Sequence, residues 1–358
     1  MTSLFDAVQF EHGPAMKNRF MLAPLTNQQS HADGTLSDDE YKWLTMRAQG
    51  GFGLTMTCAS HVQAVGQGFA GQLGCFDDKH IPGLARLAEG IKQHNSVAIV
   101  QLHHAGRRSQ ADLIGAQPLS SGDDEKMGAR AMTTAEVEEM VEAFIAAAVR
   151  VEKAGFHGVE LHGAHDYVLC QFLNGELNQR TDKYGGSLAN RMRVILEIID
   201  GIRARTGNDF NVSIRLSPER FGLKTSEMVQ VYAALASGEK LDFIDMSLWD
   251  CFKLGADEEY ADQRLIDIFT NIERGKTKLA VAGKLYATED AQRCIDAGAD
   301  MVAIGRAAIT NHDFPLQSTD PLFKMRTLPV PRTTLRDEGL SDSFIGYMGN
   351  WPGFAEPE

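Results

Sequence analysis

The sequence predicts a (β/α)8 barrel, and three observations support this fold class. An apolar run, a polar or glycine-bearing loop and a helix-period segment recur in that order eight times after about residue 19. The runs are rich in Val, Ile, Leu and Met with little alternation, which is typical of parallel strands buried on both faces. Polar and charged residues that can take part in catalysis or binding follow several of these apolar runs, as they do at the strand ends of barrel enzymes. An open, doubly wound sheet is the alternative, because periodicity alone does not show closure.

The expected elements follow one another along the chain. The strands span residues 19–23, 54–57, 97–102, 158–161, 211–216, 243–246, 278–282 and 301–304. Further helices are expected over 38–49, 81–93, 190–206, 226–237, 260–274 and 288–297. The clearest helix has a capping box, Thr133 with Glu136, and ends at Gly155.

Two segments lie outside the repeat. Residues 107–132 are too many for an ordinary strand–helix connection and predict a lid-like insertion after the third strand. Residues 329–358 predict an extended C-terminal tail, whose aromatic residues favour docking onto the barrel or onto a neighbouring subunit; a mobile end is the alternative. We expect residues 1–328 to form a single barrel domain.

Composition restricts the classes of function. The 358 residues are 43% hydrophobic and 23% charged, which suits a packed soluble core. The formal net charge of −13 argues against nucleic acid or an anionic membrane as a partner. The five cysteines lie far apart and include no Cys-x-x-Cys pair, so the spacing of an iron–sulfur cluster or a zinc ribbon is missing. This use of cysteine is typical of a protein of the reducing cytoplasm. Neither a secretory signal nor the ~18 apolar residues of a membrane span are found.

Three side chains that can hold or transfer protons follow the expected fourth strand: His162, His165 and Tyr167. Two imidazole nitrogens can hold one oxygen atom, and a phenol beside them can deliver a proton. Two alternatives stay open. One is a purely structural histidine, and the other is half of a metal site whose further ligands are not near in sequence.

The loops after the last two strands predict a phosphate site. Such loops often bind phosphate in barrels of this kind, and here they contain Gly283-Lys284 and Gly305-Arg306. The glycines let backbone N–H groups approach, and the cations pair with a dianion. Ordinary turn glycines are the alternative.

Two long donors, Gln101 and Arg215, end the third and fifth strands. A buried arginine needs an acceptor, and an internal ion pair with Glu160 or Glu219 is one possibility. The other is a polar ring that lies across the barrel mouth with its phosphate at the last two strands. Flavin mononucleotide (FMN) has that shape and polarity.

At these residues the sequence resembles the Old Yellow Enzyme family of FMN-dependent oxidoreductases. The matching stretches appear in family order between residue 17 and about residue 310. They are residues 17–26 (KNRFMLAPLT), 101–107 (QLHHAGR), 154–165 (AGFHGVELHGAH), 171–173, 178–188 (NQRTDKYGGSL), 190–191, 215–218 (RLSP) and 303–306 (AIGR).

The resemblance implies roles for particular residues. Those expected around the isoalloxazine ring are Ala23, Pro24, Leu25, Thr26, Ala59, Gln101, His162 and Arg215. Those expected at the phosphate are Gly283, Lys284, Gly305 and Arg306. His162 and His165 would bind the carbonyl oxygen of the substrate, and Tyr167 would be the proton donor, to the α-carbon. No metal site is implied.

The sequence departs from the family pattern at a few positions. Asp166 stands where the family usually has glycine, directly before Tyr167, and Thr57-Cys58 replaces a commoner acidic position on the second strand. The cysteine-rich extension of the larger dienoyl-CoA reductase relatives is not seen. Three residues, Gln28, Trp249 and Cys251, are further candidates for shaping the substrate pocket.

The implied activity is the reduction of the C=C bond of α,β-unsaturated carbonyl compounds. NADH or NADPH would give hydride to FMN, and flavin N5 would pass it to a small electrophilic alkene in a ping-pong cycle. Homo-oligomers occur in the family. Three alternatives stay open: a dehydrogenase or demethylase of the same family, a metal-dependent hydrolase that uses His162 and His165 as ligands, and a non-catalytic binding barrel.

Overall fold

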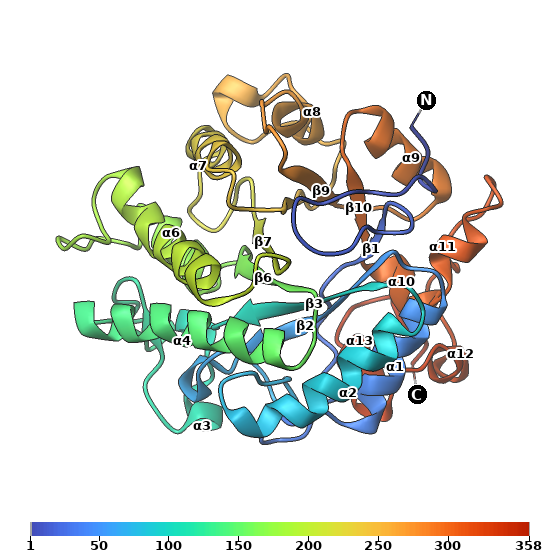
Figure 1. Cartoon of the computed structure of the whole chain (residues 1–358), viewed down its shortest axis with the longest axis horizontal. Helices are drawn as coiled ribbons and strands as arrows, with labels where there is room; N and C mark the ends of the chain where they lie inside the picture. The colour runs from blue at the N-terminus through green and yellow to red at the C-terminus, as the bar shows by residue number, and fades with distance from the viewer. Residues whose placement is uncertain (1, 358) are drawn as a thin grey trace.

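The computed structural model describes residues 2–357, and its main sheet is a closed parallel barrel (Figure 1). Its strands are β1 (Phe20–Leu22), β2 (Leu54–His61), β3 (Val97–His103), β6 (Gly158–Gly163), β7 (Asn211–Leu216), β8 (Phe243–Ser247), β9 (Lys278–Ala282) and β10 (Met301–Ile304). Their order is β1-β10-β9-β8-β7-β6-β3-β2, and β1 pairs with both β10 and β2. The predicted (β/α)8 barrel is therefore confirmed, and closure excludes the doubly wound sheet.

Helices surround the barrel (Figure 1). The outer helices are α1 (Asp38–Gln49), α2 (Ile81–Lys92), α4 (Thr134–Lys153), α6 (Leu188–Arg205), α7 (Thr225–Ser237), α8 (Leu265–Thr270), α9 (Thr288–Asp296) and α10 (Arg306–Thr310). The predicted capping box begins α4. Thr133 Oγ1 accepts the Glu136 N–H at 3.2 Å, and the Glu136 carboxylate accepts the Thr133 N–H at 2.8 Å.

Two elements differ from the sequence-based expectation. The helix expected over 260–274 is shortened to α8, because Gly255 N–H and Leu265 N–H bond across a short antiparallel bridge to Gln263 and Lys253. Those backbone groups are no longer available to a helix. In contrast, β2 continues to His61, because it resumes pairing with β3 after an irregularity between Met56 and Ala59.

The core has two layers. One cluster fills the barrel interior, where Met21, Met56, Ile99, Phe243 and Met301 are almost completely buried. A larger cluster lies between the strands and the surrounding helices. Side chains alternate between these layers along each strand, which is why the strands read as continuous apolar runs. No helix in the described part of the chain is long and apolar enough to cross a membrane.

Residues 107–132 form a small subdomain after β3. It contains a 3-10 turn (Gly106–Arg108), the short helix α3 (Ala111–Ile114) and a two-stranded parallel sheet of β4 (Leu119–Ser120) and β5 (Arg130–Ala131). A further short helix, α5 (Val168–Leu173), follows β6 and lies against this segment.

The C-terminal segment is helical, so the expectation of an extended tail is wrong. After α11 (Phe314–Gln317) it forms α12 (Arg332–Asp337) and α13 (Asp342–Gly349). Phe344 of α13 packs edge-to-face on Trp43 of α1, with ring centroids 5.4 Å apart. The buried Arg47 lies over Trp43 and donates to the Glu338 carbonyl at 2.8 Å, which ties α1 to this segment. Apolar burial against α1 therefore determines the conformation of the tail.

Candidate active site

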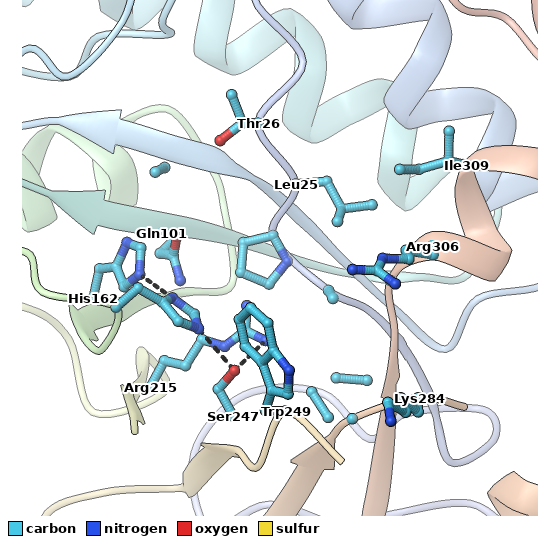
Figure 2. Close-up of a pocket in the computed structure, with 18 of the residues that line it drawn as sticks. Leu25, Thr26, Gln101, His162, Arg215, Ser247, Trp249, Lys284, Arg306 and Ile309 are labelled. Carbon is cyan, nitrogen blue, oxygen red and sulfur yellow. Dashed lines mark hydrogen bonds between the residues drawn. The ribbon is translucent and has the colours of Figure 1, made fainter. Parts of the chain in front are cut away.

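A cavity of about 500 Å3 lies at the C-terminal ends of the barrel strands (Figure 2). It is lined by all the residues that the sequence predicted around the ring, at the phosphate and at the substrate oxygen. These residues are Ala23, Pro24, Leu25, Thr26, Ala59, Gln101, His162, His165, Tyr167, Arg215, Gly283, Lys284, Gly305 and Arg306. Of the three pocket candidates, Trp249 lines the cavity, whereas Cys251 is buried in the outer core and Gln28 is not part of the lining.

A chain of side-chain hydrogen bonds crosses one side of the cavity. His103 Nδ1 lies 3.0 Å from His162 Nδ1, and His162 Nε2 lies 3.0 Å from His165 Nδ1. His165 Nε2 then contacts Ser247 Oγ at 2.8 Å. The backbone of the loop is also held, because the His165 N–H donates to Ser217 Oγ at 3.1 Å. β3, β6, β7 and β8 therefore all contribute to the position of the two predicted histidines.

Both histidines are neutral and the phenol is protonated. Burial lowers the pKa of His162 well below its usual value of 6.5, and burial together with Arg215 lowers the pKa of His165 to about 3. Burial raises the pKa of Tyr167 above 10.0, although Arg108 opposes this effect. At neutral pH the cavity thus offers uncharged N–H donors and a phenolic O–H.

The direction of these hydrogen bonds follows from the number of protons available. A neutral imidazole has one N–H. If His103 Nδ1 donates to His162 Nδ1, the proton of His162 is therefore on its Nε2, which faces His165. The opposite direction would put a proton on His103 Nε2, which is buried and has no partner among the described residues. An unpaired buried N–H is rare and costs about 1–3 kcal/mol. We therefore assign the direction in which His103 donates.

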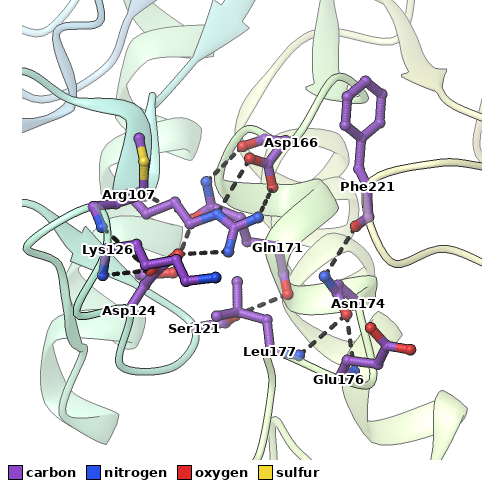
Figure 3. Close-up of polar contacts among 12 residues, drawn as sticks. Arg107, Ser121, Asp124, Lys126, Asp166, Gln171, Asn174, Glu176, Leu177 and Phe221 are labelled. Carbon is purple, nitrogen blue, oxygen red and sulfur yellow. Dashed lines mark hydrogen bonds and ion pairs between the residues drawn. The ribbon is translucent and has the colours of Figure 1, made fainter.

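The loop that carries Tyr167 is held in an unusual backbone conformation. His165 and Asp166 both have left-handed backbones, with φ of 61° and 62°. Arg107 binds the Asp166 carboxylate through two bonds, at 2.7 and 3.2 Å, as Figure 3 shows. Arg108 donates to the His165 carbonyl at 2.7 Å, and its guanidinium lies 4.8 Å from the centre of the Tyr167 ring. These contacts fix the phenol beside His162, with ring centroids 4.8 Å apart.

Arg215 forms an internal ion pair, but with neither of the two predicted partners. Its Nε lies 3.0 Å from Asp245 Oδ2, and its Nη2 donates to Ser247 at 3.4 Å. Burial, together with Asp245, raises the pKa of Glu160 well above 4.5, so that carboxyl keeps its proton. Gln101 Nε2 donates to Glu160 at 2.8 Å, which leaves the amide oxygen of Gln101 as an acceptor.

The opposite side of the cavity has the features of a phosphate site. Figure 2 shows Lys284 and Arg306 across the cavity from His162, Gln101 and Arg215. A Cβ added at Gly305 would meet only Leu25 Cδ2, at 3.8 Å, so the backbone there is open to a ligand. In contrast, Gly283 is required by packing, because its Cβ would lie 2.8 Å from the Asp250 nitrogen.

The two sides together fit FMN. Backbone access at Gly305 and the cations Lys284 and Arg306 suit a phosphate, although Lys284 also pairs with Asp250 at 3.0 Å. Gln101 and Arg215 present an acceptor and donors to a polar ring. No group of three His, Cys, Asp or Glu side chains in residues 2–357 is arranged to hold a metal ion.

The sequence reasoning missed several lining residues. Arg108 follows directly after the 101–107 stretch, and Arg220 lies just after 215–218. Their position next to these two matching stretches is the sequence feature that could have indicated them. Tyr347 and Trp351 also line the cavity of their own chain. The sequence alone does not decide whether these aromatic residues reach this cavity or that of a neighbouring subunit, because it does not show where a tail folds back.

Comparison with known proteins identifies the family. The model of the NADH:flavin oxidoreductase / NADH oxidase family matches residues 3–322. The chain belongs to this family. The resemblance to Old Yellow Enzyme is confirmed, and the protein is an NAD(P)H-dependent flavin oxidoreductase with FMN as its cofactor.

Individual relatives agree with this family. The chain is 34% identical over 327 residues to "Probable NADH-dependent flavin oxidoreductase YqiG" of Bacillus subtilis, covering 88% of this chain and 87% of the relative. It is 30% identical over 333 residues to an NADPH dehydrogenase of Bacillus cytotoxicus, covering 90% and 93% of the two chains. The Old Yellow Enzyme homologue of Zymomonas mobilis has the same fold, with a TM-score of 0.80, 24% identity and coverage of 96% and 99%.

Proposed function

We propose that this flavin oxidoreductase reduces the C=C bond of α,β-unsaturated carbonyl compounds in a ping-pong cycle with NADH or NADPH. One observation carries the proposal: two neutral imidazoles and a protonated phenol lie together at the cavity that fits FMN. His162 and His165 are hydrogen-bonded at 3.0 Å, and the rings of His162 and Tyr167 are 4.8 Å apart.

The cofactor would be held by the two sides of the cavity already described. Lys284, Arg306 and the backbone at Gly305 would bind the phosphate, and Gln101 and Arg215 would contact the polar edge of the ring. Pro24, Thr26 and Ala59 would complete the walls around the ring, with Ala23 and Leu25 next to them. When bound, FMN supplies the hydride that it has received from the nicotinamide.

The residues of this chain would activate the alkene. His162 and His165 donate N–H bonds to the carbonyl oxygen and stabilise the negative charge that develops there. His165 can do so only when its proton is on Nδ1 and Ser247 donates to Nε2, so the incoming oxygen replaces the His162–His165 bond. Tyr167, whose raised pKa keeps its proton in place, protonates the α-carbon.

We further propose that residues 329–358 act with the 1–328 barrel rather than as an independent unit, because Tyr347 and Trp351 line the cavity. A cytoplasmic location is also proposed. The five cysteines are all free and buried, as expected in a reducing compartment.

The experiment that tests this function separates the two half-reactions. In Tyr167→Phe, oxidation of the reduced flavin by cyclohexenone should slow by about 100-fold or more, because the proton donor is lost. Reduction of the flavin by NADPH should change far less, because that step needs no proton from Tyr167. Stopped-flow absorbance under anaerobic conditions measures both rates. Equal losses in the two half-reactions, or a wild-type reduced enzyme that no enone oxidises, would contradict the proposal.

A further inference from the structure

The cavity is much more positive than the chain around it. Its described lining contains five cationic side chains, Arg108, Arg215, Arg220, Lys284 and Arg306, and no Asp or Glu. The chain as a whole has a formal net charge of −13. A cavity lined by one sign of charge attracts ligands of the opposite sign. The positive lining therefore indicates that anions bind here.

FMN accounts for only part of this charge. Lys284 and Arg306 follow β9 and β10, where the phosphate is expected, and Arg215 would contact the polar edge of the ring. Arg108 follows β3 and Arg220 follows β7. In the closed strand order, β3 lies opposite β9. Two arginines thus remain on the side of the barrel mouth that carries the histidines and Tyr167.

Neither of these arginines has an acidic partner among the described residues. Two acidic residues near them already have partners: Asp166, on the loop that Arg108 contacts, binds Arg107, and Glu219, next to Arg220, forms an ion pair with Lys253. Within residues 2–357 Arg220 forms no ion pair, and its guanidinium lies over the Trp249 ring, 4.2 Å from its centre. Their charge is therefore available to a ligand.

Both guanidinium groups are nevertheless held in place. Arg108 is fixed by its 2.7 Å bond to the His165 carbonyl and by the Tyr167 ring. Arg220 is fixed by stacking on Trp249 and by a left-handed backbone with φ of 69°. A guanidinium held in this way loses less conformational entropy when it binds an anion, and it can bind a carboxylate or phosphate through two bonds.

We propose that Arg108 and Arg220 form an anion-binding subsite beside His162, His165 and Tyr167. The subsite binds a carboxylate or phosphate group of the molecule that occupies the substrate side of the cavity. This inference rests on the proposed function, and it adds that the preferred ligand is negatively charged. The anionic group belongs either to the alkene, as a carboxylate, or to the nicotinamide nucleotide, as a phosphate.

The test compares charged and neutral ligands in each half-reaction of the holoenzyme. Reduced enzyme is mixed with 4-oxopent-2-enoate or with its methyl ester, which share the same activated C=C bond. Oxidised enzyme is mixed with NADPH or with the neutral 1-benzyl-1,4-dihydronicotinamide. The variants are Arg220→Gln, Arg108→Gln and Arg220→Lys. The matched control is Arg86→Gln, which also removes an exposed arginine stacked on an aromatic ring, Tyr41, at 4.1 Å, but outside the cavity.

The result expected is a change in preference rather than in rate alone. In Arg220→Gln and Arg108→Gln, the preference for the carboxylate over the ester should fall about tenfold, since charge-assisted hydrogen bonds are lost. Arg220→Lys should restore part of it, and Arg86→Gln should match the wild type. Taking ratios cancels any effect of Arg108 on Tyr167, because both substrates need the same proton.

The other outcomes decide the source of the anion or overturn the subsite. If only the preference for NADPH over the benzyl compound falls, the subsite binds the phosphate of the nucleotide. If both preferences are unchanged in Arg220→Gln and in Arg108→Gln, the subsite is wrong. A wild-type enzyme that neither the ester nor the acid oxidises would refute the proposed function instead, and the nicotinamide comparison would still test the subsite.

Discussion

At the scale of single residues, two adjacent histidines show how strand geometry assigns different tasks to identical side chains. His103 and His104 follow one another at the end of β3, so they point to opposite faces. His103 contacts His162, whereas His104 Nδ1 accepts the Gly106 N–H at 3.0 Å and supports the following turn. Burial lowers the pKa of both, so His103 acts on His162 as a neutral donor. It is a positioning residue for the proposed reaction.

Replacing His103 tests this role. His103→Leu removes the donor to His162 Nδ1, which allows the His162 proton to move to Nδ1 and away from the substrate oxygen. Oxidation of reduced flavin by an enone should slow roughly 10- to 100-fold, somewhat less than the loss of a whole oxyanion donor. His103→Asn keeps an N–H near the same place and should recover most of the rate. Stopped-flow rates and the affinity for a phenol ligand measure the effect, and equal behaviour of Leu and Asn would contradict it.

At the scale of elements, a cluster of polar contacts joins the 107–132 insertion to the loop after β6 (Figure 3). Arg107 binds Asp166 on that loop and Asp124 of the insertion, with Nη1 to Oδ2 at 2.7 Å. Gln171 of α5 donates to the Asp166 carbonyl at 2.6 Å and accepts the Arg107 N–H at 3.1 Å. Through Arg107, Asp166 is thus joined to Asp124 of the insertion.

Removing the shared cation should destabilise both segments. Arg107→Met leaves the carboxylates of Asp124 and Asp166 without their partner, and both are about 15% exposed, at 14% and 16%. The expected loss in the free energy of unfolding is about 3 kcal/mol. Urea denaturation of the holoenzyme measures it. Adding Asp166→Asn should recover part of the loss, and Lys126→Met, an exposed change in the same insertion, should cost little. A similar loss in the Arg107 and Lys126 variants would show that the cluster does not hold the insertion.

At the scale of the whole molecule, buried neutral imidazoles make the fold sensitive to acid. Burial lowers the pKa of five histidines to between about 3 and about 4: His61, His80, His104, His157 and His165. An unfolded histidine titrates near 6.5, so below about pH 6.5 the unfolded chain binds more protons than the folded one. The stability present above that pH is therefore lost as the pH falls towards about 4.

A single variant outside the cavity measures this dependence. His157 Nδ1 accepts the Ala98 N–H at 3.0 Å, and the side-chain oxygen in His157→Asn can accept the same bond without titrating. Between about pH 7 and about pH 5, the wild type should lose about 1–2 kcal/mol more unfolding free energy than the variant. Urea denaturation of the holoenzyme at the two pH values gives the difference. Parallel losses in the two proteins would mean that His157 is not protonated on unfolding in this range.

The sequence by itself determined the fold class, the cofactor family and part of the cavity lining. The barrel was predictable because parallel strands that are buried on both faces need continuous apolar runs. The site was predictable because only a few residue types at the strand ends can bind a phosphate and a polar ring. Gly305-Arg306 and His162 with His165 and Tyr167 carried that signal, since their chemistry is local in sequence. Their catalytic roles remain predictions.

Only the tertiary structure decided which distant groups meet. It shows that the barrel is closed and that the tail forms helices packed against Trp43. It also shows that Arg215 pairs with Asp245 rather than with Glu160 or Glu219. It also brings His103 into contact with His162 and, in the described part of the chain, gives Arg108 and Arg220 no acidic partner. Hydrogen-bond direction and uncompensated charge depend on distances between elements far apart in the chain, and such distances are set by packing rather than by local pattern.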